Sequence, residues 1–427
     1  MQQQELIRSI ENGALDARFA TLYGKEAVVA QRARYIDAIT AFANRFGTNR
    51  DIRLFSVPGR SELSGNHTDH NRGAVIATSI HLDIIAVASA REDSIITVLS
   101  QGFPEDRVDI ADYVAPRAER FARSDAIIAG MCAGFRKSGY AVGGFDAYTT
   151  SSVLKGSGLS SSAAFEVMIG NIENHLYNAG RVDNVEIAKL AQYAENEFFG
   201  KPCGLMDQVA CAAGGIVAID FETPGAPVIE QIDFDLTARD FALCIVDTGG
   251  NHADLTPDYA AVPCEMRAVA AALGKTVLRE SDKETLLAAL PTLRESLGDR
   301  AVLRALHFYN ENARVEKQKA ALLADDLAAY FDLVRASGRS SFCYLQNVYT
   351  TANVKEQGLS LALCLAEDFL ADKLGACRVH GGGFAGTIQA YVKSADVADF
   401  CALMDSVFGK GAAIPLHVRP EGAIALV

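Results

Sequence analysis

The sequence predicts an α+β protein of two domains. Its 427 residues exceed what one ordinary hydrophobic core accommodates, so we expect two. Runs rich in Val and Ile, such as AVIATSIHLDIIAVASA, have strand character, and amphipathic helical stretches lie between them. Because strands and helices mix in both halves without a regular strand–helix–strand repeat, the pattern favours α+β over a doubly wound sheet.

The expected elements of the first half follow in order. Residues 1–47 have an amphipathic helical pattern, and RLFSVPGR then predicts a strand that runs into a turn. AVIATSIHLDIIAVASA and SIITVLS predict two more strands, and GFDAYTTSSV is a further candidate that leads directly into KGSGLSSSAA. Periodic apolar residues then predict two helices, the second of which is broken by Gly200 and Pro202.

The second half begins after a strand, GGIVAIDF. Residues 222–235 combine Pro, Gly and several acids, so we expect the transition between domains there. FALCIVDT predicts a strand, and residues 260–336 are expected to be mostly helical. Residues 376–392, ACRVHGGGFAGTIQAYV, predict a strand, a glycine turn and another strand.

Composition narrows the classes of function. The net charge of −13 disfavours nonspecific binding to nucleic acid or to an anionic membrane. No run reaches the length of an apolar membrane span, and MQQQELIRSIENG lacks the apolar run of a signal peptide. The nine cysteines are scattered with no CxxC pair. We therefore expect a cytoplasmic protein with reduced thiols.

The stretch KGSGLSSSAA, residues 155–164, admits two interpretations. Its composition suits a flexible linker, but it lies between a predicted strand and a periodic helix. Gly156 and Gly158 permit backbone angles that point successive N–H groups into one concavity. The serines add hydroxyl donors at the start of a helix, whose N-terminus attracts anions. The position favours a phosphate loop, although not the GxxxxGK[ST] type, which the sequence lacks.

The segment VPGRSELSGNHTDHNRG, residues 57–73, is dense in short polar side chains. Such groups suit hydrogen bonding to a polyol, because sugar hydroxyls both donate and accept. Two alternatives stay open at this point: a metal cluster of His67, Asp69 and His70, and a plain solvated loop.

Two later segments carry further candidates. In AENEFFGKPCGLMDQ, residues 194–208, Glu195 lies late in a predicted helix and Asp207 follows a glycine-rich turn, where an acid can orient or deprotonate a hydroxyl. In HGGGFAGT, residues 380–387, three consecutive glycines permit close approach of a ligand or of another backbone. A surface acid and a tight hairpin are the respective alternatives.

These four segments, in this order, resemble the GHMP kinases, and within them the galactokinases. GSGLSSSAA is similar to the ATP loop of that superfamily, and HGGGFAGT to its C-terminal glycine motif. GRSELSGNHTDHNRG resembles the galactokinase signature GRVNLIGEHTDYNxG, and AENEFFGKPCGLMDQ resembles AEHEFxGxPCGxMDQ. The resemblance implies a two-domain fold, with domains over 1–220 and 221–427, and an active site in the cleft between them.

The resemblance also implies roles for individual residues. Asp207 matches the acid that faces the anomeric hydroxyl, and Arg60 the arginine that pairs with it. Ser162 and Glu195 match Mg²⁺ ligands. The ATP-binding positions are Gly156, Ser157, Gly158, Leu159, Ser160, Ser161 and Ser162. The sugar-binding positions are Asn66, His67, Asp69, Gly204 and Tyr259, of which Tyr259 matches only loosely.

Three departures from the signature concern the sugar. The family's Asn is Glu62 here, its Glu is Asn66, and its Tyr is His70. We expect an ATP- and Mg²⁺-dependent sugar 1-kinase, with galactose as substrate. The alternatives are galacturonate, N-acetylgalactosamine or arabinose as substrate, a non-catalytic regulator that binds galactose and ATP, and a kinase for a non-sugar alcohol. We expect a monomer, with an oligomer as the alternative.

Overall fold

The computed structural model describes residues 1–154, 158–201, 203–223, 225–250 and 255–427. Helices and strands mix in both halves, and the predicted α+β class is confirmed. The expected helices over 1–47 and 260–336 are present. Within the described ranges, each helix is too short or too polar to cross a membrane.

The first sheet is built around one long strand. It comprises β1 (Arg53–Ser64), β2 (Ala74–Ala90), β3 (Ile95–Ser100), β4 (Asp106–Asp109), β5 (Phe145–Ser151), β6 (Ile216–Asp220), β7 (Val228–Ile232) and β12 (Ile424–Ala425). The main path runs β12-β1-β2-β5-β3-β4, and β6 joins β2 to β7. The first part of β2 pairs with β6 and the last part with β5, both antiparallel, whereas β3 and β5 are parallel.

The second sheet has the order β11-β8-β10-β9 and is antiparallel throughout. Its strands are β8 (Phe241–Asp247), β9 (Ala376–Val379), β10 (Thr387–Lys393) and β11 (Ala413–Leu416). The hairpin predicted over 376–392 is therefore confirmed as β9 and β10.

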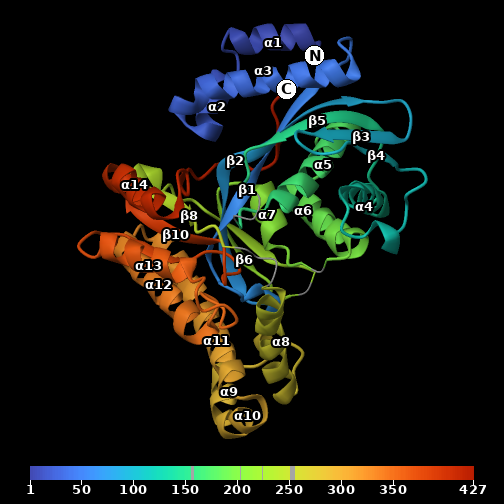
Figure 1. Cartoon of the computed structure of the whole chain (residues 1–427). Helices are drawn as coiled ribbons and strands as arrows, with labels where there is room; N and C mark the ends of the chain where they lie inside the picture. Colours follow the sequence, from blue (N-terminus) through green and yellow to red (C-terminus); the bar gives the residue numbers. More distant parts are fainter. Residues whose placement is uncertain (155–157, 202, 224, 251–254) are drawn as a thin grey trace.

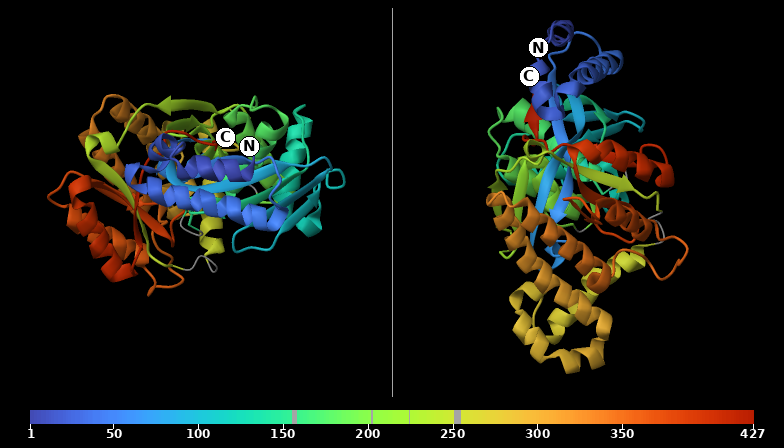
Figure 2. Two further views of the ribbon diagram at one scale, coloured as in Figure 1. Left: turned by 90° about the horizontal axis from the view of Figure 1, so that it is seen from above. Right: turned by 90° about the vertical axis from the view of Figure 1, so that its left-hand side faces the viewer.

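The helices surround these sheets. Their bounds are α1 (Gln3–Glu11), α2 (Asp16–Tyr23), α3 (Val28–Phe46), α4 (Ser124–Lys137), α5 (Ser161–Tyr177), α6 (Asn184–Tyr193), α7 (Met206–Ala213), α8 (Thr256–Ala272), α9 (Lys283–Ala288), α10 (Leu290–Leu297), α11 (Asp299–Leu323), α12 (Leu327–Ser340), α13 (Gly358–Leu370) and α14 (Val397–Phe408). In Figures 1 and 2, α9 and α10 project at the end of the molecule opposite α1–α3.

Strand alternation explains the layers, because successive side chains point to opposite faces of a sheet. On β1, Leu54 packs with α1–α3 while Phe55 joins the main core with α5 and α7. On β8, Leu243 joins that same core, whereas Cys244 packs against α13 and α14. The main core therefore spans parts of both sheets.

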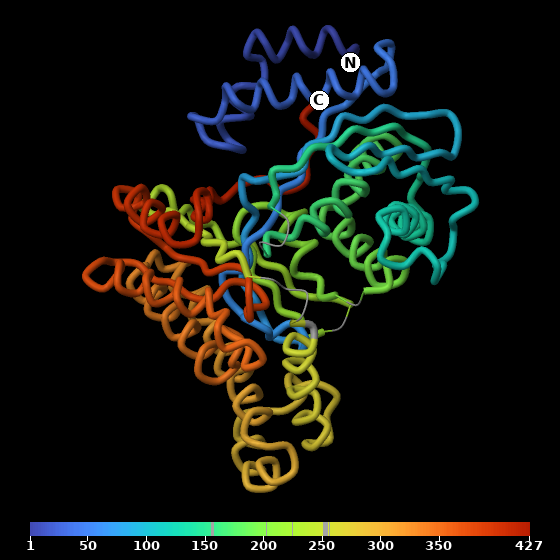
Figure 3. Tube along the Cα trace, in the orientation of Figure 1, coloured from blue at the N-terminus to red at the C-terminus, as the bar shows by residue number. Residues whose placement is uncertain are grey.

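Two strands from after residue 220 belong to the first sheet, so a division of the chain at that residue does not separate the two sheets. Residues 228–232, expected in the transition between domains, form β7 and pair with β6, because the β6–β7 hairpin continues the first sheet. The C-terminal strand β12 returns to pair with β1, and Gln2 pairs with Asp51 just before β1, so the two termini lie near one another (Figure 3). The domain ranges 1–220 and 221–427 stay a prediction.

Candidate active site

The four segments singled out in the sequence meet at one cavity of about 410 Å³. Its lining residues are Arg60, Glu62, His67, Asp69, His70, Ser162, Glu195, Lys201, Cys203, Gly204, Met206, Asp207, Gln208, Tyr259, Pro263, Gly381 and Gly382. They come from β1, the loop after it, α5, the segment that leads into α7, α8, and the turn between β9 and β10. The cavity thus lies where the two halves of the chain touch.

Arg60 and Asp207 form a bidentate ion pair at this cavity. Arg60 Nε and Nη2 donate to Asp207 Oδ1 and Oδ2, each at 2.8 Å. The Arg60 side chain is 8% exposed and that of Asp207 is 32% exposed, so the carboxylate opens toward the cavity. Burial acts to raise the pKa of Asp207, but the charge and hydrogen bonds of Arg60 outweigh it and lower that pKa. Asp207 is therefore ionised at neutral pH.

The start of α5 fixes this pair from the other side. Ser160 has a left-handed backbone with φ of 57° and its hydroxyl donates to Asp207 Oδ2. Arg60 Nη1 donates to the carbonyl of Gly158, and the buried Leu159 accepts from the backbone N–H of Arg60 at 3.1 Å. The N-terminus of α5, which attracts negative charge, thus begins beside the ion pair. Gly156 and Ser157 lie outside the described residues.

A second cavity of about 570 Å³ adjoins the first. Both cavities are lined by Ser162, Glu195 and Lys201, so they meet at these three side chains. Beyond that junction, the second cavity is walled mainly by apolar groups, including Phe103, Phe165 and Phe199, and it also includes Ser161. The site therefore has a polar chamber and a more apolar chamber that share one polar boundary.

Acidic groups gather at that boundary. Glu195 lies in a π-helical turn over Ala194–Phe199, a distortion that is frequent at functional sites. Gln208 Nε2 donates to Glu195 Oε2 at 2.9 Å and to Glu166 Oε2 at 3.1 Å, and Lys201 Nζ lies 3.0 Å from Glu195 Oε1. Burial and the neighbouring Glu195 raise the pKa of Glu166 well above its usual range. Lys201 is thus ion-paired with Glu195, and its charge acts, less strongly, to lower the pKa of Glu166.

The loop after β1 contributes His67 and Asp69. His67 Nε2 donates to the carbonyl of Gly382 at 2.9 Å, and burial lowers the His67 pKa to about 4, so the ring is neutral. Its Nδ1 is buried and, among the described residues, has no hydrogen-bond partner; the same holds for Gln208 Oε1. Both residues line the cavity, and a buried polar atom without a partner calls for an explanation at each of them.

Gly204 and Tyr259 shape the same chamber. A Cβ at Gly204 would lie 2.7 Å from Asp69 Oδ2, so a larger residue there would displace the Asp69 carboxylate. Tyr259 Oη donates to the carbonyl of Gly383 at 2.6 Å, and a Cβ on Gly382 would lie 2.8 Å from the Tyr259 ring. The glycine turn therefore allows both a hairpin and close backbone approach.

Asn66 does not line the cavity with the other predicted sugar positions. It is fully buried, and its Nδ2 donates to the carbonyl of Gly381 at 2.7 Å. Its Oδ1 accepts from Asn347 at 2.9 Å and from Ser341 at 3.1 Å. Both ends of the amide are bonded within the protein.

The alternative of a metal cluster at His67, Asp69 and His70 finds no counterpart. Across the ranges that the structure describes, no group of three or more His, Cys, Asp or Glu side chains is placed to hold a metal ion.

The lining residues that were not among the sequence candidates include Glu62, Glu166, Gln208 and Lys201, and simple signals mark the first three. Glu62 follows Arg60 by two positions, which puts both on one face of a strand. Glu166 follows Ser162 by four positions, which puts both on one face of a helix. Gln208 is adjacent to Asp207. For Lys201, an exposed lysine in a loop, the sequence offers no signal.

Comparisons with known proteins agree with this geometry. Residues 40–90 match the galactokinase galactose-binding signature, and residues 126–215 match the GHMP kinases N-terminal domain. A galactokinase of Streptomyces coelicolor is 33% identical over 362 residues, covering 83% of this chain and 88% of the relative. A galactokinase of Homo sapiens is 28% identical over 400 residues, covering 91% of this chain and 96% of the relative.

Solved structures show the same fold. The crystal structure of Lactococcus lactis galactokinase complexed with galactose has a TM-score of 0.76 at 24% identity, covering 90% of this chain and 98% of that one. Methanococcus jannaschii mevalonate kinase has a TM-score of 0.61 at 13% identity, covering 86% of this chain and 98% of that one. The chain belongs to the galactokinase family of the GHMP kinases.

Proposed function

We propose that the protein is a sugar 1-kinase that transfers the γ-phosphoryl group of ATP to the anomeric hydroxyl of galactose. The observation that carries the proposal is the pair of cavities that meet at Ser162, Glu195 and Lys201. Phosphoryl transfer depends chiefly on positioning two substrates and on neutralising charge between them. Two chambers with a polar boundary meet that requirement.

The larger chamber is assigned to ATP. Its aromatic walls suit the flat apolar faces of a nucleobase, and Ser161 at its edge belongs to the first turn of α5. The N–H groups of that turn and the helix dipole stabilise phosphate oxygens. Among the predicted ATP positions, Ser161 and Ser162 line this chamber.

The smaller chamber is assigned to the sugar. Asp207, ionised because of Arg60, accepts a hydrogen bond from the attacking hydroxyl and aims its oxygen. Its low proton affinity favours orientation over full proton removal. Arg60 adds fixed positive charge beside the developing phosphate charge. His67 and Asp69, which line the chamber, offer an imidazole ring and a carboxylate to the other sugar hydroxyls.

Mg²⁺ is assigned to the boundary between the chambers. The donors there are hard oxygens, from the Ser162 hydroxyl and the Glu195 carboxylate, with Glu166 behind them. A bound cation would offset the repulsion between Glu195 and Glu166 that helps to raise the Glu166 pKa, so these residues fit the ion. When bound, Mg²⁺ neutralises charge on the ATP phosphates. The monomeric state and the cytoplasmic location stay predictions.

An enzyme-coupled assay for ADP release tests the proposal. Wild-type protein with ATP, Mg²⁺ and galactose should release ADP, whereas Asp207→Asn should lose turnover but still bind nucleotide in calorimetry. Wild-type turnover in Asp207→Asn would remove the role given to Asp207. Binding of galactose and ATP by the wild type with no ADP release would favour the regulator instead.

A further inference from the structure

Glu62 places a carboxylate in the sugar chamber. Two residues along a strand span about 7 Å and face the same side, so Glu62 lies beside Arg60 on the cavity face of β1. Glu62 Oε1 accepts from Arg378 Nη2 and, at 3.3 Å, from Asn66 Nδ2. Among the described residues, no hydrogen bond reaches Glu62 Oε2. One oxygen is therefore anchored and the other is available to a ligand.

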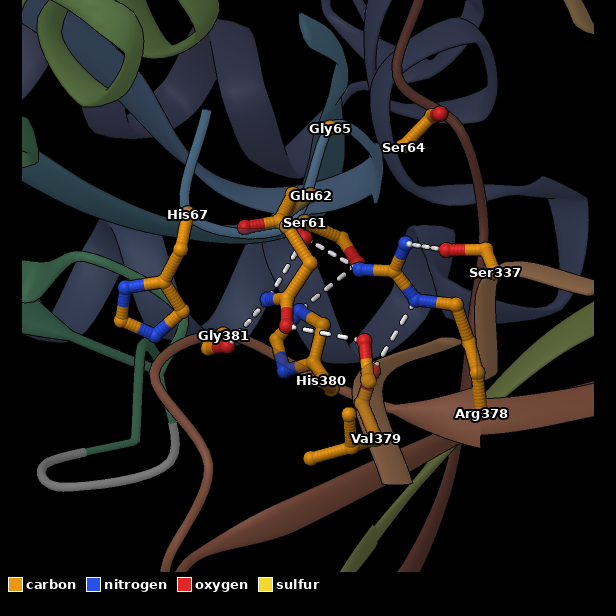
Figure 4. Close-up of polar contacts among 12 residues, drawn as sticks. Ser61, Glu62, Ser64, Gly65, His67, Ser337, Arg378, Val379, His380 and Gly381 are labelled. Atoms are coloured by element: carbon orange, nitrogen blue, oxygen red, sulfur yellow. Dashed lines mark hydrogen bonds and ion pairs between the residues drawn. The ribbon is translucent and has the colours of Figure 1, made fainter. Parts of the chain in front are cut away.

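Arg378 holds that carboxylate rigidly. The arginine is fully buried, and its Nη1 donates to Ser337 Oγ at 3.1 Å while its Nε donates to the carbonyl of Val379 at 3.0 Å. Figure 4 shows Glu62 between Arg378 on one side and Gly381 and His67 on the other. A carboxylate bonded to a buried arginine keeps its orientation, and Arg378 opposes the rise in the Glu62 pKa that burial causes.

The acid and the amide of the family signature have changed places in this chain. The signature has Asn where this chain has Glu62, and Glu where this chain has Asn66. The two side chains contact each other, and the amide at position 66 is satisfied by Gly381, Asn347 and Ser341. The acid at this end of the chamber is thus supplied by β1 instead of by the loop.

We propose that Glu62 is the specificity-determining residue of the sugar chamber, where its free oxygen accepts hydrogen bonds from sugar hydroxyls remote from the reacting one. This inference rests on the proposed function. The chamber wall carries four acids, Glu62, Asp69, Glu195 and Asp207, against three cations, which are Arg60 and Lys201 on the wall and Arg378 bonded to Glu62. A neutral sugar suits such a wall, whereas a uronate would meet repulsion. The reversed signature therefore preserves neutral-sugar recognition and does not select for galacturonate.

Calorimetric titration of sugars into wild type, Glu62→Gln and a control tests this. In Glu62→Gln we expect the Kd of galactose to rise roughly ten- to hundredfold, as for loss of a charged hydrogen bond, with the Kd of ATP unchanged. Galacturonate should bind the variant more tightly than it binds the wild type. The control is Glu173→Gln, which alters another fully buried acid outside the cavity lining and should leave both sugar affinities unchanged.

The outcomes separate this inference from the proposed function. Sugar affinities in Glu62→Gln within twofold of the wild type would overturn the role of Glu62. Tight galactose binding without ADP release would overturn the kinase activity but leave the role of Glu62 supported if the variant binds weakly. If Glu62→Gln does not fold, Glu62→Asp keeps the ion pair but draws the carboxylate back, and it should weaken galactose binding in the same direction. Unchanged affinity in Glu62→Asp would then overturn the inference.

Discussion

The ion pair between Arg60 and Asp207 makes a quantitative prediction about stability. The perturbation is a double-mutant cycle of Arg60→Met, Asp207→Asn and the two together. The pair has two hydrogen bonds of 2.8 Å, with the arginine side chain 8% and the aspartate side chain 32% exposed. Removing one partner of a buried pair costs ~3–5 kcal/mol, because the other charge is left unpaired.

The exposure of Asp207 to the cavity reduces that figure. We expect each single variant to lose ~2–4 kcal/mol of unfolding free energy, since water reaches the remaining charge in part. The double variant should lose less than the sum, with a coupling of ~2 kcal/mol. At pH 7 the effect is complete, because the Asp207 pKa lies below its usual 3.8; it should vanish as the pH falls through the lowered pKa.

Urea unfolding of the four ligand-free proteins at pH 7, followed by circular dichroism, measures the cycle. A coupling below ~0.5 kcal/mol, the level of exposed pairs, would refute the view that the site holds a buried and preorganised ion pair.

Three further predictions follow from other residues. Burial raises the Glu173 pKa from 4.5 to about 8, so between these pH values the folded state holds a proton that the unfolded state loses. The stability of the wild type should therefore fall as the pH rises from 4.5 to 8. In urea unfolding, Glu173→Gln should be more stable than the wild type by up to ~4–5 kcal/mol above pH 8 and similar to it at pH 4. Gly204→Ala should raise the KM for sugar at least about tenfold with little change in the KM for ATP, because its Cβ would meet Asp69; equal changes in both constants would contradict this. Electron paramagnetic resonance can follow the binding of Mn²⁺, in place of Mg²⁺, in the presence of ATP. Glu195→Gln should raise the Mn²⁺ concentration needed for half-saturation by about tenfold or more. An unchanged concentration would show that Glu195 does not hold the metal.

Much of the fold could be predicted because local patterns determine it. The helices over 1–47 and 260–336 and the β9–β10 hairpin follow from apolar periodicity and a glycine turn. Strand β7, within the stretch 222–235, could not be predicted because it is mostly exposed and lacks the apolar run of a buried strand.

The site shows a different limit. The order of the four motifs was enough to predict that Arg60, Asp207 and Glu195 share one cavity. In the structure, these three residues line the same cavity. The partner of Glu62 could not be predicted from the sequence. Arg378 lies 316 residues away in the chain, and only the contact between the two halves brings it to Glu62. The burial of Asn66 likewise depends on Asn347 and Ser341, which no motif marks.

The central claim is that this chain transfers phosphate from ATP to the anomeric hydroxyl of galactose. Phosphorus NMR of wild-type protein with ATP, Mg²⁺ and galactose tests it most directly. We predict an anomeric sugar phosphate that forms in equal amount with ADP. Absence of ADP above the level seen without sugar, or a phosphate on any other hydroxyl, would contradict the claim.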